Sequence, residues 1–276
     1  MNKTLFISDL DGTLLNNDAR ISEYTAKTLN RMINEGLMFT VASARSIISA
    51  SDKLKCVKWK HNGVFMNGVL LCDINSHKTI DYKNIDSKSA EKLIDIFNKY
   101  DRPPTVFSFT GPKTDNGYDT AISVRSGGLK TQADVDFYEE RKNKYNEYII
   151  SNKFDTKSVV YVNGMDNYNT MNQIYDEASK IDSISCDFYK DIYTGLWLLE
   201  CHSKSASKAK RALDLKKRYN ADKLVAFGDN FNDIEMLKSA DVAIVVNNAP
   251  DEVKEYADII IDSNYNDGVA KYLRSL

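Results

Sequence analysis

Apolar and polar residues alternate along both ends of the chain in the rhythm of strands followed by helices. Short apolar runs are separated by longer segments whose apolar positions fall on one helical face. Strands are expected at 4–8, 37–43, 223–229, 242–246 and 258–262. Helices are expected at 22–36, 205–220, 232–240, 249–257 and 268–276. This alternation predicts an α/β fold, a Rossmann-like, doubly wound parallel sheet with helices on both faces.

The middle of the chain has a different rhythm, in which strands come in neighbouring pairs. Strands are expected at "TVFSFT", "TAISVR", "SVVYVNG", "SCDFY" and "GLWLLEC". Helices are expected at 89–100, around 132–147 and around 167–180. Paired strands favour a mainly antiparallel sheet with helices on one face, which is an α+β arrangement. We therefore expect a core domain of residues 1–82 and 197–276, interrupted by an inserted cap domain at 83–196.

Composition narrows the class of protein without naming a function. With 276 residues and 42% hydrophobic residues, the chain is long and apolar enough to bury a sizeable core. The net charge of −2 gives no general attraction to nucleic acid or anionic membranes, so neither partner is expected. No segment approaches the ~20 apolar residues of a membrane span, and no signal peptide is evident. We expect a cytoplasmic protein with reduced cysteines, either a monomer or a weak homodimer.

Two acidic residues directly follow the first expected strand. In the stretch "LFISDLDGTLL", Asp9 and Asp11 lie two residues apart, so their side chains point the same way if the extended backbone continues. Two ionised carboxylates on one face repel each other, and each resists losing its water. A positive group between them would remove this conflict.

Other strands bring more polar groups to the same edge of the sheet. Ser43 and Arg45 follow the second strand, and Asp229, Asn232 and Asp233 follow the strand at 223–229. Ligands of an open parallel sheet lie beyond the carboxyl ends of its strands. Several carboxylates gathered there favour a hard divalent cation with oxygen ligands, and Mg²⁺ is the default for such a site.

Lys208 is placed where a helix does not favour a cation. With Ser205 as the N-cap, Lys208 lies in the first turn of its helix, where the helix dipole favours anions. The conflict disappears if Lys208 faces the carboxylates or a bound phosphate. A helix beginning near Asn232 would point its free N–H groups at the same place. Together these groups fit phosphoryl transfer through an aspartyl-phosphate, although the residues alone do not say which carboxylate reacts.

Four segments resemble the four motifs of the haloacid dehalogenase superfamily, in their usual order. They are "DLDGTLL" (9–15), "TVASAR" (40–45), "SASKAKRAL" (205–213) and "GDNFNDIEML" (228–237). More narrowly, the chain resembles a Cof-type phosphatase with a large cap between the second and third motifs. The "NG" at 67–68 and "NYNDGVAKYL" at 264–273 also fit that subfamily.

The resemblance implies a role for each matched residue. Asp9 would attack the phosphorus, and Asp11 would protonate the leaving oxygen, later activate water and offer its backbone carbonyl to Mg²⁺. Lys208 would neutralise charge on Asp9 and the phosphate. The implied metal-site residues are Asp9, Asp11, Asp229 and Asp233. The expected substrate contacts are Ser43, Ala44, Arg45, Lys208 and Asn232.

The motifs depart from the family pattern at two places. Ala44 stands where glycine often follows the Ser or Thr of the second motif, and "SKSAS" replaces a glycine turn before the third. Neither change removes a catalytic group, but both affect loop shape and therefore what can be inferred about the substrate. For Arg45, a surface role competes evenly with a substrate clamp.

The function expected from these residues and the resemblance is Mg²⁺-dependent hydrolysis of a small phosphorylated metabolite. By analogy with the family, this metabolite is a sugar phosphate or a similar compound, with pyridoxal phosphate and flavin mononucleotide also open. A phosphomutase of the same superfamily is the nearest alternative. A phosphometabolite-binding protein without activity is the alternative from another class, and the intact set of acidic residues and Lys208 argues against it.

Overall fold

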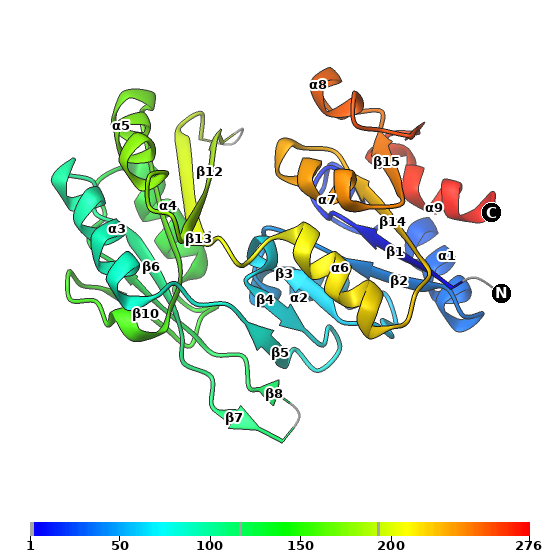
Figure 1. The fold of residues 1–276 in the computed structure, drawn as a ribbon, viewed down its shortest axis with the longest axis horizontal. Coiled ribbons are helices and arrows are strands. Elements are labelled where there is room, and N and C mark those ends of the chain that lie inside the picture. The colour runs from blue at the N-terminus through cyan, green and yellow to red at the C-terminus, as the bar shows by residue number, and fades with distance from the viewer. Residues whose placement is uncertain (1–2, 116, 192–193) are drawn as a thin grey trace. The chain divides into compact units, whose positions relative to one another are not determined.

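In the computed structural model, which describes residues 3–115, 117–191 and 194–276, five parallel strands form the sheet expected from both ends of the chain (Figure 1). The order across the sheet is β16-β15-β14-β1-β2. The strands are β1 (Thr4–Ser8), β2 (Met38–Val41), β14 (Lys223–Gly228), β15 (Val242–Val246) and β16 (Ile259–Ile261). Figure 1 shows β1, near the N-terminus, beside β14. The two strands are parallel, and their register pairs Thr4 with Lys223.

Helices cover both faces of this sheet, which confirms the doubly wound α/β fold. The helices are α1 (Glu23–Asn34), α6 (Lys208–Arg218), α7 (Ile234–Ser239), α8 (Asp251–Lys254) and α9 (Gly268–Arg274). Buried residues of α6, α7 and α8 pack on one face, against strand residues such as Leu5, Ile7 and Ala226. On the other face, Tyr272 of α9 meets Phe227 edge-on, with ring centroids 5.8 Å apart.

A short excursion after β2 supports the start of α6. It contains α2 (Ile47–Leu54), β3 (Gly63–Phe65), the turn η1 (Met66–Gly68), β4 (Leu70–Cys72) and β5 (Thr79–Tyr82). Gly68 has φ +100°, and a Cβ there would lie 2.5 Å from the carbonyl carbon of Ser207. Arg211 of α6 donates from Nε to the Gly68 carbonyl at 2.9 Å. The glycine therefore allows the turn to pack directly on the beginning of α6.

The chain divides into two compact units, one of Met1–Asp81 with Ser207–Leu276 and one of Tyr82–Ala206, here called the cap. The cap sheet has the strand order β10-β9-β6-β11-β13-β12. Its strands are β6 (Thr105–Phe109), β9 (Ile122–Ser126), β10 (Glu147–Ile150), β11 (Val159–Asp166), β12 (Ile184–Lys190) and β13 (Trp197–Ser203). The cap also contains the helices α3 (Ser87–Lys99), α4 (Gln132–Arg141) and α5 (Tyr168–Ala178), the turn η2 (Thr156–Ser158) and a hairpin of β7 (Lys113–Thr114) and β8 (Gly117–Tyr118).

The cap differs from its sequence prediction in two ways. The helix expected to reach residue 147 ends at Arg141, and β10 follows as a strand parallel to β9. The helices also do not share one face, because only α3 and α5 pack on the apolar side with Val106, Val162 and Leu199.

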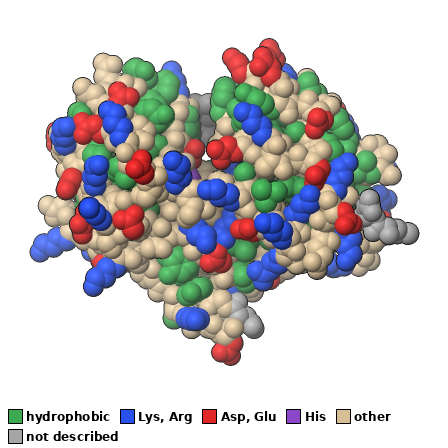
Figure 2. All heavy atoms as spheres, viewed as in Figure 1, with side chains coloured by type: hydrophobic (Ala, Val, Ile, Leu, Met, Phe, Trp, Pro, Cys, Tyr) green, Lys and Arg blue, Asp and Glu red, His purple; other side chains and the backbone are tan. Residues whose placement is uncertain are grey.

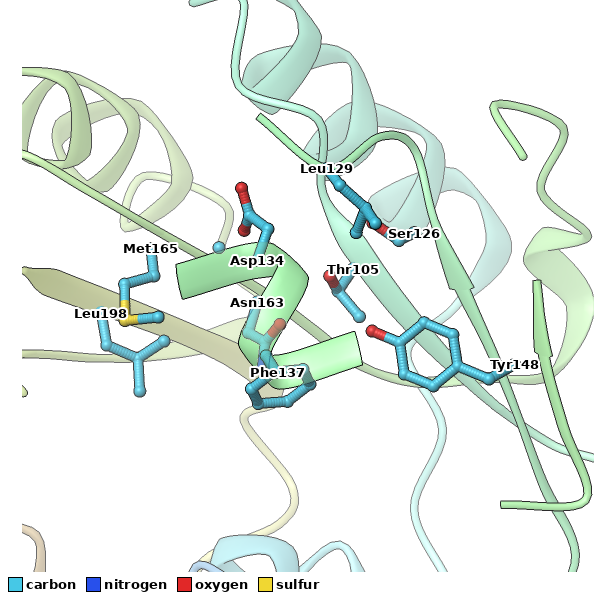
Figure 3. Close-up of a pocket in the computed structure, with 10 residues that line it drawn as sticks. Thr105, Ser126, Leu129, Asp134, Phe137, Tyr148, Asn163, Met165 and Leu198 are labelled. Carbon is cyan, nitrogen blue, oxygen red and sulfur yellow. The ribbon is translucent and has the colours of Figure 1, made fainter. Parts of the chain in front are cut away.

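Helix α4 lies against the other face of the cap sheet, where a small cavity separates it from the strands. Asp134 and Phe137 of α4 line this cavity together with Thr105 and Asn163 of the sheet, as Figure 3 shows. Its volume of about 20 Å³ has room for about one water molecule and not for a metabolite. This cavity is therefore not a substrate site.

Basic and acidic side chains are interspersed over the face shown in Figure 2. Among the helices of the described residues, none is long and apolar enough to cross a membrane.

Candidate active site

Three aspartates from two distant parts of the sequence meet at the carboxyl edge of the parallel sheet. Asp9 directly follows β1, Asp229 follows β14, and Asp233 ends the turn η3 (Phe231–Asp233). One carboxylate oxygen from each lies within 4.8 Å of the others. Asp9 is 5% exposed and Asp233 is fully buried, so water screens their repulsion poorly. The juxtaposition expected from the strand ends is present in the structure.

Lys208 supplies a positive charge among these carboxylates. Its Nζ donates to Oδ1 of Asp9 at 2.6 Å and to Oδ1 of Asp233 at 2.8 Å. The lysine is the first residue of α6, and the N-cap is Ser207, whose side chain accepts from the N–H of Lys210. The prediction of Ser205 as the cap is therefore wrong, because the cap lies two residues later. Lys208 is 3% exposed, and its position at a helix start is explained by its two acidic partners.

Burial and mutual repulsion make it costly for all three carboxylates of the cluster to be ionised at once. Burial, followed by the charge of Asp233, raises the pKa of Asp9 well above its usual range despite the nearby lysine. Burial and Asp233 also raise the pKa of Asp229 to about 7. For Lys208, burial works to lower the pKa, but Asp233 and Asp9 outweigh it and raise the pKa above its usual value. One ammonium group thus does not neutralise three carboxylates.

The turn after β1 is built around Asp229. Thr13 donates from Oγ1 to Oδ1 of Asp229 at 2.7 Å. Gly12 has φ +80°, and a Cβ on it would lie 2.2 Å from Oδ2 of Asp229. A side chain at position 12 would therefore collide with the carboxylate, so glycine is required for this close approach.

Asp11 lies outside the three-carboxylate cluster. Its side chain is 44% exposed and accepts two hydrogen bonds from Arg45, at 2.6 Å from Nε and 2.7 Å from Nη2. Ser43 is buried beneath this pair, and its Oγ accepts from the N–H of Arg45 at 3.1 Å. Ala44, between them, is partly buried. The structure thus joins Arg45 of the second motif to Asp11.

The loop of the fourth motif is held by its own side chains. Oδ2 of Asp233 accepts from the N–H groups of Asp229 and Asn230, each at 3.2 Å. Helix α7 begins only at Ile234, after the turn η3, so the helix expected from residue 232 starts slightly later. Asn232 lies in that turn and is partly buried beside the acidic cluster.

The residues of the cluster fit a divalent cation with oxygen ligands. Oxygen-only donors suit Mg²⁺, Ca²⁺ or Mn²⁺. Burial and the neighbouring charge of Asp233 raise the pKa values of Asp9 and Asp229, and a divalent cation would offset both effects.

Two site residues were not expected from the sequence. The side-chain amide of Asn248 donates to the carbonyl of Gly12 at 2.8 Å, and that of Asn264 donates to the carbonyl of Leu15 at 2.8 Å. Both asparagines follow strands of the parallel sheet, β15 and β16. The rule that selects polar residues after strand ends would have named them if it had been applied to every strand.

Comparison with known proteins defines the family. A model of the haloacid dehalogenase-like hydrolases matches residues 6–273. The 5-amino-6-(5-phospho-D-ribitylamino)uracil phosphatase YcsE of Bacillus subtilis is 25% identical over 98% of this chain and 94% of its own. The structure of TM0651 from Thermotoga maritima has a TM-score of 0.76 at 22% identity, covering 100% of this chain and 98% of that one. For the subclass IIB sugar phosphatase BT4131 the TM-score is 0.73 at 19% identity, with 99% and 98% covered.

The chain belongs to the haloacid dehalogenase-like hydrolases. The resemblance of its four motifs to the Cof-type phosphatases with a large cap is thereby confirmed, and the protein is an enzyme of the phosphatase type.

The cap contains a separate group of ionisable side chains, on the sheet face away from α3 and α5. Nε2 of His202 lies 3.2 Å from Oδ2 of Asp187, and the hydroxyl of Tyr189 donates to Oε2 of Glu200 at 3.0 Å. Burial, followed by the charge of Asp187, raises the pKa of Glu200 to about 7, although Tyr189, Tyr161 and His202 oppose the shift. Glu200 is therefore a partly buried acid that is costly to ionise.

We expect Glu200→Gln to stabilise the protein increasingly as the pH rises. A raised folded-state pKa means that the wild type loses stability between about pH 4.5 and pH 7, where Glu200 ionises in the unfolded chain but keeps its proton in the folded protein. The advantage of glutamine should therefore be small at pH 5 and reach about 3 kcal/mol at pH 8, from 1.36 kcal/mol per pKa unit. Urea unfolding at the two pH values measures it.

Glu177→Gln is the matched control for this prediction. Glu177 lies on α5 of the cap, and its hydrogen bonds from Lys99 and Tyr100 lower its pKa. The control should therefore show no gain at pH 8. Equal effects of Glu200→Gln at pH 5 and pH 8 would contradict a raised pKa of Glu200 in the folded protein.

Proposed function

We propose that the protein is a Mg²⁺-dependent phosphatase that hydrolyses a small phosphorylated metabolite through an aspartyl-phosphate on Asp9. The observation that carries the proposal is the position of Lys208, whose Nζ lies 2.6 Å from Asp9 and 2.8 Å from Asp233 in a buried site. A buried ammonium group beside a carboxylate nucleophile offsets the charge that a phosphoryl group brings. Asp229, within reach of the same oxygens, completes a site for a cation.

Asp9 is the nucleophile in this proposal, and Asp11 is the acid and base. A carboxylate oxygen of Asp9 forms a bond to phosphorus while the bond from phosphorus to the leaving oxygen breaks. Asp11 gives a proton to the leaving oxygen and then takes one from the water that hydrolyses the aspartyl-phosphate. Its pair with Arg45 is partly exposed and therefore weak enough to open when Asp11 acts.

The remaining residues hold the phosphoryl group and the cation. Mg²⁺, when bound, supplies charge that offsets the carboxylates and the phosphoryl oxygens. Asp9, Asp229 and the backbone carbonyl of Asp11 would bind it, with Asp233 close by. Ser43 accepts from Arg45 through Oγ and keeps its own O–H to donate to a phosphoryl oxygen. Asn232 and Arg45 are the further phosphate contacts that we propose, with Ala44 beside them.

The substrate class is a small phosphorylated metabolite, chosen by the cap. The name of the relative YcsE specifies a phosphorylated ribityl compound, and that of BT4131 specifies sugar phosphates. These names support a phosphate monoester on a polyhydroxylated carbon chain. The cap residues 82–206 are the part of the chain that we propose selects the leaving group.

The test is a phosphate-release assay over a panel of sugar phosphates and other phosphometabolites, with and without Mg²⁺. Release of free phosphate that depends on Mg²⁺ supports the proposal. Conversion of a substrate to its phosphate isomer without release identifies a phosphomutase. No turnover of any panel member, nor of p-nitrophenyl phosphate, contradicts the proposed activity.

A further inference from the structure

Two asparagines from separate loops hold the turn that follows β1. Nδ2 of Asn248 donates to the carbonyl of Gly12, and Oδ1 of Asn248 accepts from the N–H of Asn264 at 2.9 Å. Nδ2 of Asn264 then donates to the carbonyl of Leu15. The two asparagines thus form one chain of hydrogen bonds, which binds the turn at Gly12 and at Leu15.

These hydrogen bonds hold the part of the turn that contacts the acidic cluster. Between Gly12 and Leu15 lies Thr13, whose hydroxyl donates to Asp229 at 2.7 Å. The Cα of Gly12 also packs against the Asp229 carboxylate, as the 2.2 Å clash of an added Cβ shows. A shift of the Gly12 carbonyl therefore moves two contacts of Asp229 together.

The two asparagines differ in how much they contribute to folding. Asn264 is 6% exposed, and its bond to Leu15 is buried, so its loss would damage the fold itself. Asn248 is exposed, and water can replace its hydrogen bonds. An effect of Asn248 on the site can therefore be separated from an effect on stability.

We infer that Asn248 is a positioning residue, which acts through the Gly12–Thr13 segment to orient Asp229 for binding the divalent cation. The inference rests on the proposed function, both for the Mg²⁺ site at Asp229 and for its effect on turnover. Partners outside the ligand set that orient metal ligands typically contribute 10–100-fold in metal affinity or activity.

The experiment compares Asn248→Ala with Asn266→Ala in the full chain. Asn266 lies on the neighbouring loop, and its Nδ2 donates at 3.0 Å to Asp262 rather than to the turn. We expect Asn248→Ala to weaken Mg²⁺ binding, measured by isothermal titration calorimetry, by about tenfold or more. The kcat for p-nitrophenyl phosphate should fall by a similar factor with little change in KM, while the melting temperature moves no more than in the control.

Two further variants make the result specific. Asn248→Asp keeps the acceptor for Asn264 and loses the donor to Gly12, so it should weaken metal binding as alanine does. The double variant Asn248→Ala, Thr13→Val should lose no more affinity than the worse single variant, because both act through one turn. Metal affinity equal to that of Asn266→Ala, or additive losses in the double variant, would overturn the inference. Because calorimetry needs no turnover, failure of the proposed phosphatase activity leaves this test intact.

Discussion

Asp9→Asn is expected to abolish turnover while the protein stays folded. An amide is a poor nucleophile, so kcat for p-nitrophenyl phosphate should fall by more than about a thousandfold. Asparagine keeps the size of aspartate and an oxygen that can accept from Nζ of Lys208, now 2.6 Å from Asp9. Because burial and Asp233 raise the pKa of Asp9, its replacement by a neutral group removes a costly charge and should not lower the free energy of unfolding.

The matched control is Asp18→Asn, the same change at an exposed residue of the same N-terminal segment. It should leave kcat unchanged. Circular dichroism and thermal unfolding check that both variants are folded. Turnover of Asp9→Asn within tenfold of the wild type would exclude Asp9 as the nucleophile.

Lys208→Met is expected to cause the largest loss of stability in the core. The substitution leaves Asp9 and Asp233 without their shared cation, and breaking a buried ion pair in this way costs about 3–5 kcal/mol. The loss should be greatest at pH 8. It should be smaller at pH 5, because the raised folded-state pKa of Asp9 favours its neutral form as the pH falls, and a neutral Asp9 does not need the lysine.

Urea unfolding of metal-free protein at the two pH values measures this effect, and kcat should fall strongly as well. Lys210→Met is the control, since Lys210 lies on the same helix with an exposed side chain. A Lys208→Met variant as stable as the wild type at pH 8 would mean that the carboxylates around it are not ionised in the folded protein.

The elements of the parallel sheet could be predicted because each carries its own apolar signal. The first strand, Thr4–Ser8, and the elements between Lys208 and Arg274 lie within a few residues of their expected bounds. The cap was harder where that signal is weak. Helix α4 buries none of its side chains fully, so no apolar stripe marks its end, and the expected helix ran on into β10.

The part of the site that could be predicted is the part identified by the ends of the strands and by the sequence motifs. Both place Asp9, Asp229 and Asp233 at one edge, and the helix dipole identifies Lys208 as unusual. The pair of Asp11 with Arg45 could not be predicted, because it depends on side-chain conformations that no spacing determines. Whether Ser43, Asn232 and Arg45 contact a phosphate stays a prediction, as do the roles of Asp9, Asp11 and Lys208.

The pairing of β1 with β14 constrains how the protein is made. Thr4 is matched with Lys223, so the strand that carries Asp9 has an open side until the chain past residue 223 has left the ribosome. The whole of Tyr82–Ala206 is synthesised in the interval. Contacts so distant in sequence form slowly, and an unpaired strand edge invites aggregation. A nascent chain from which residue 223 has not yet emerged would therefore hold an unfinished catalytic sheet.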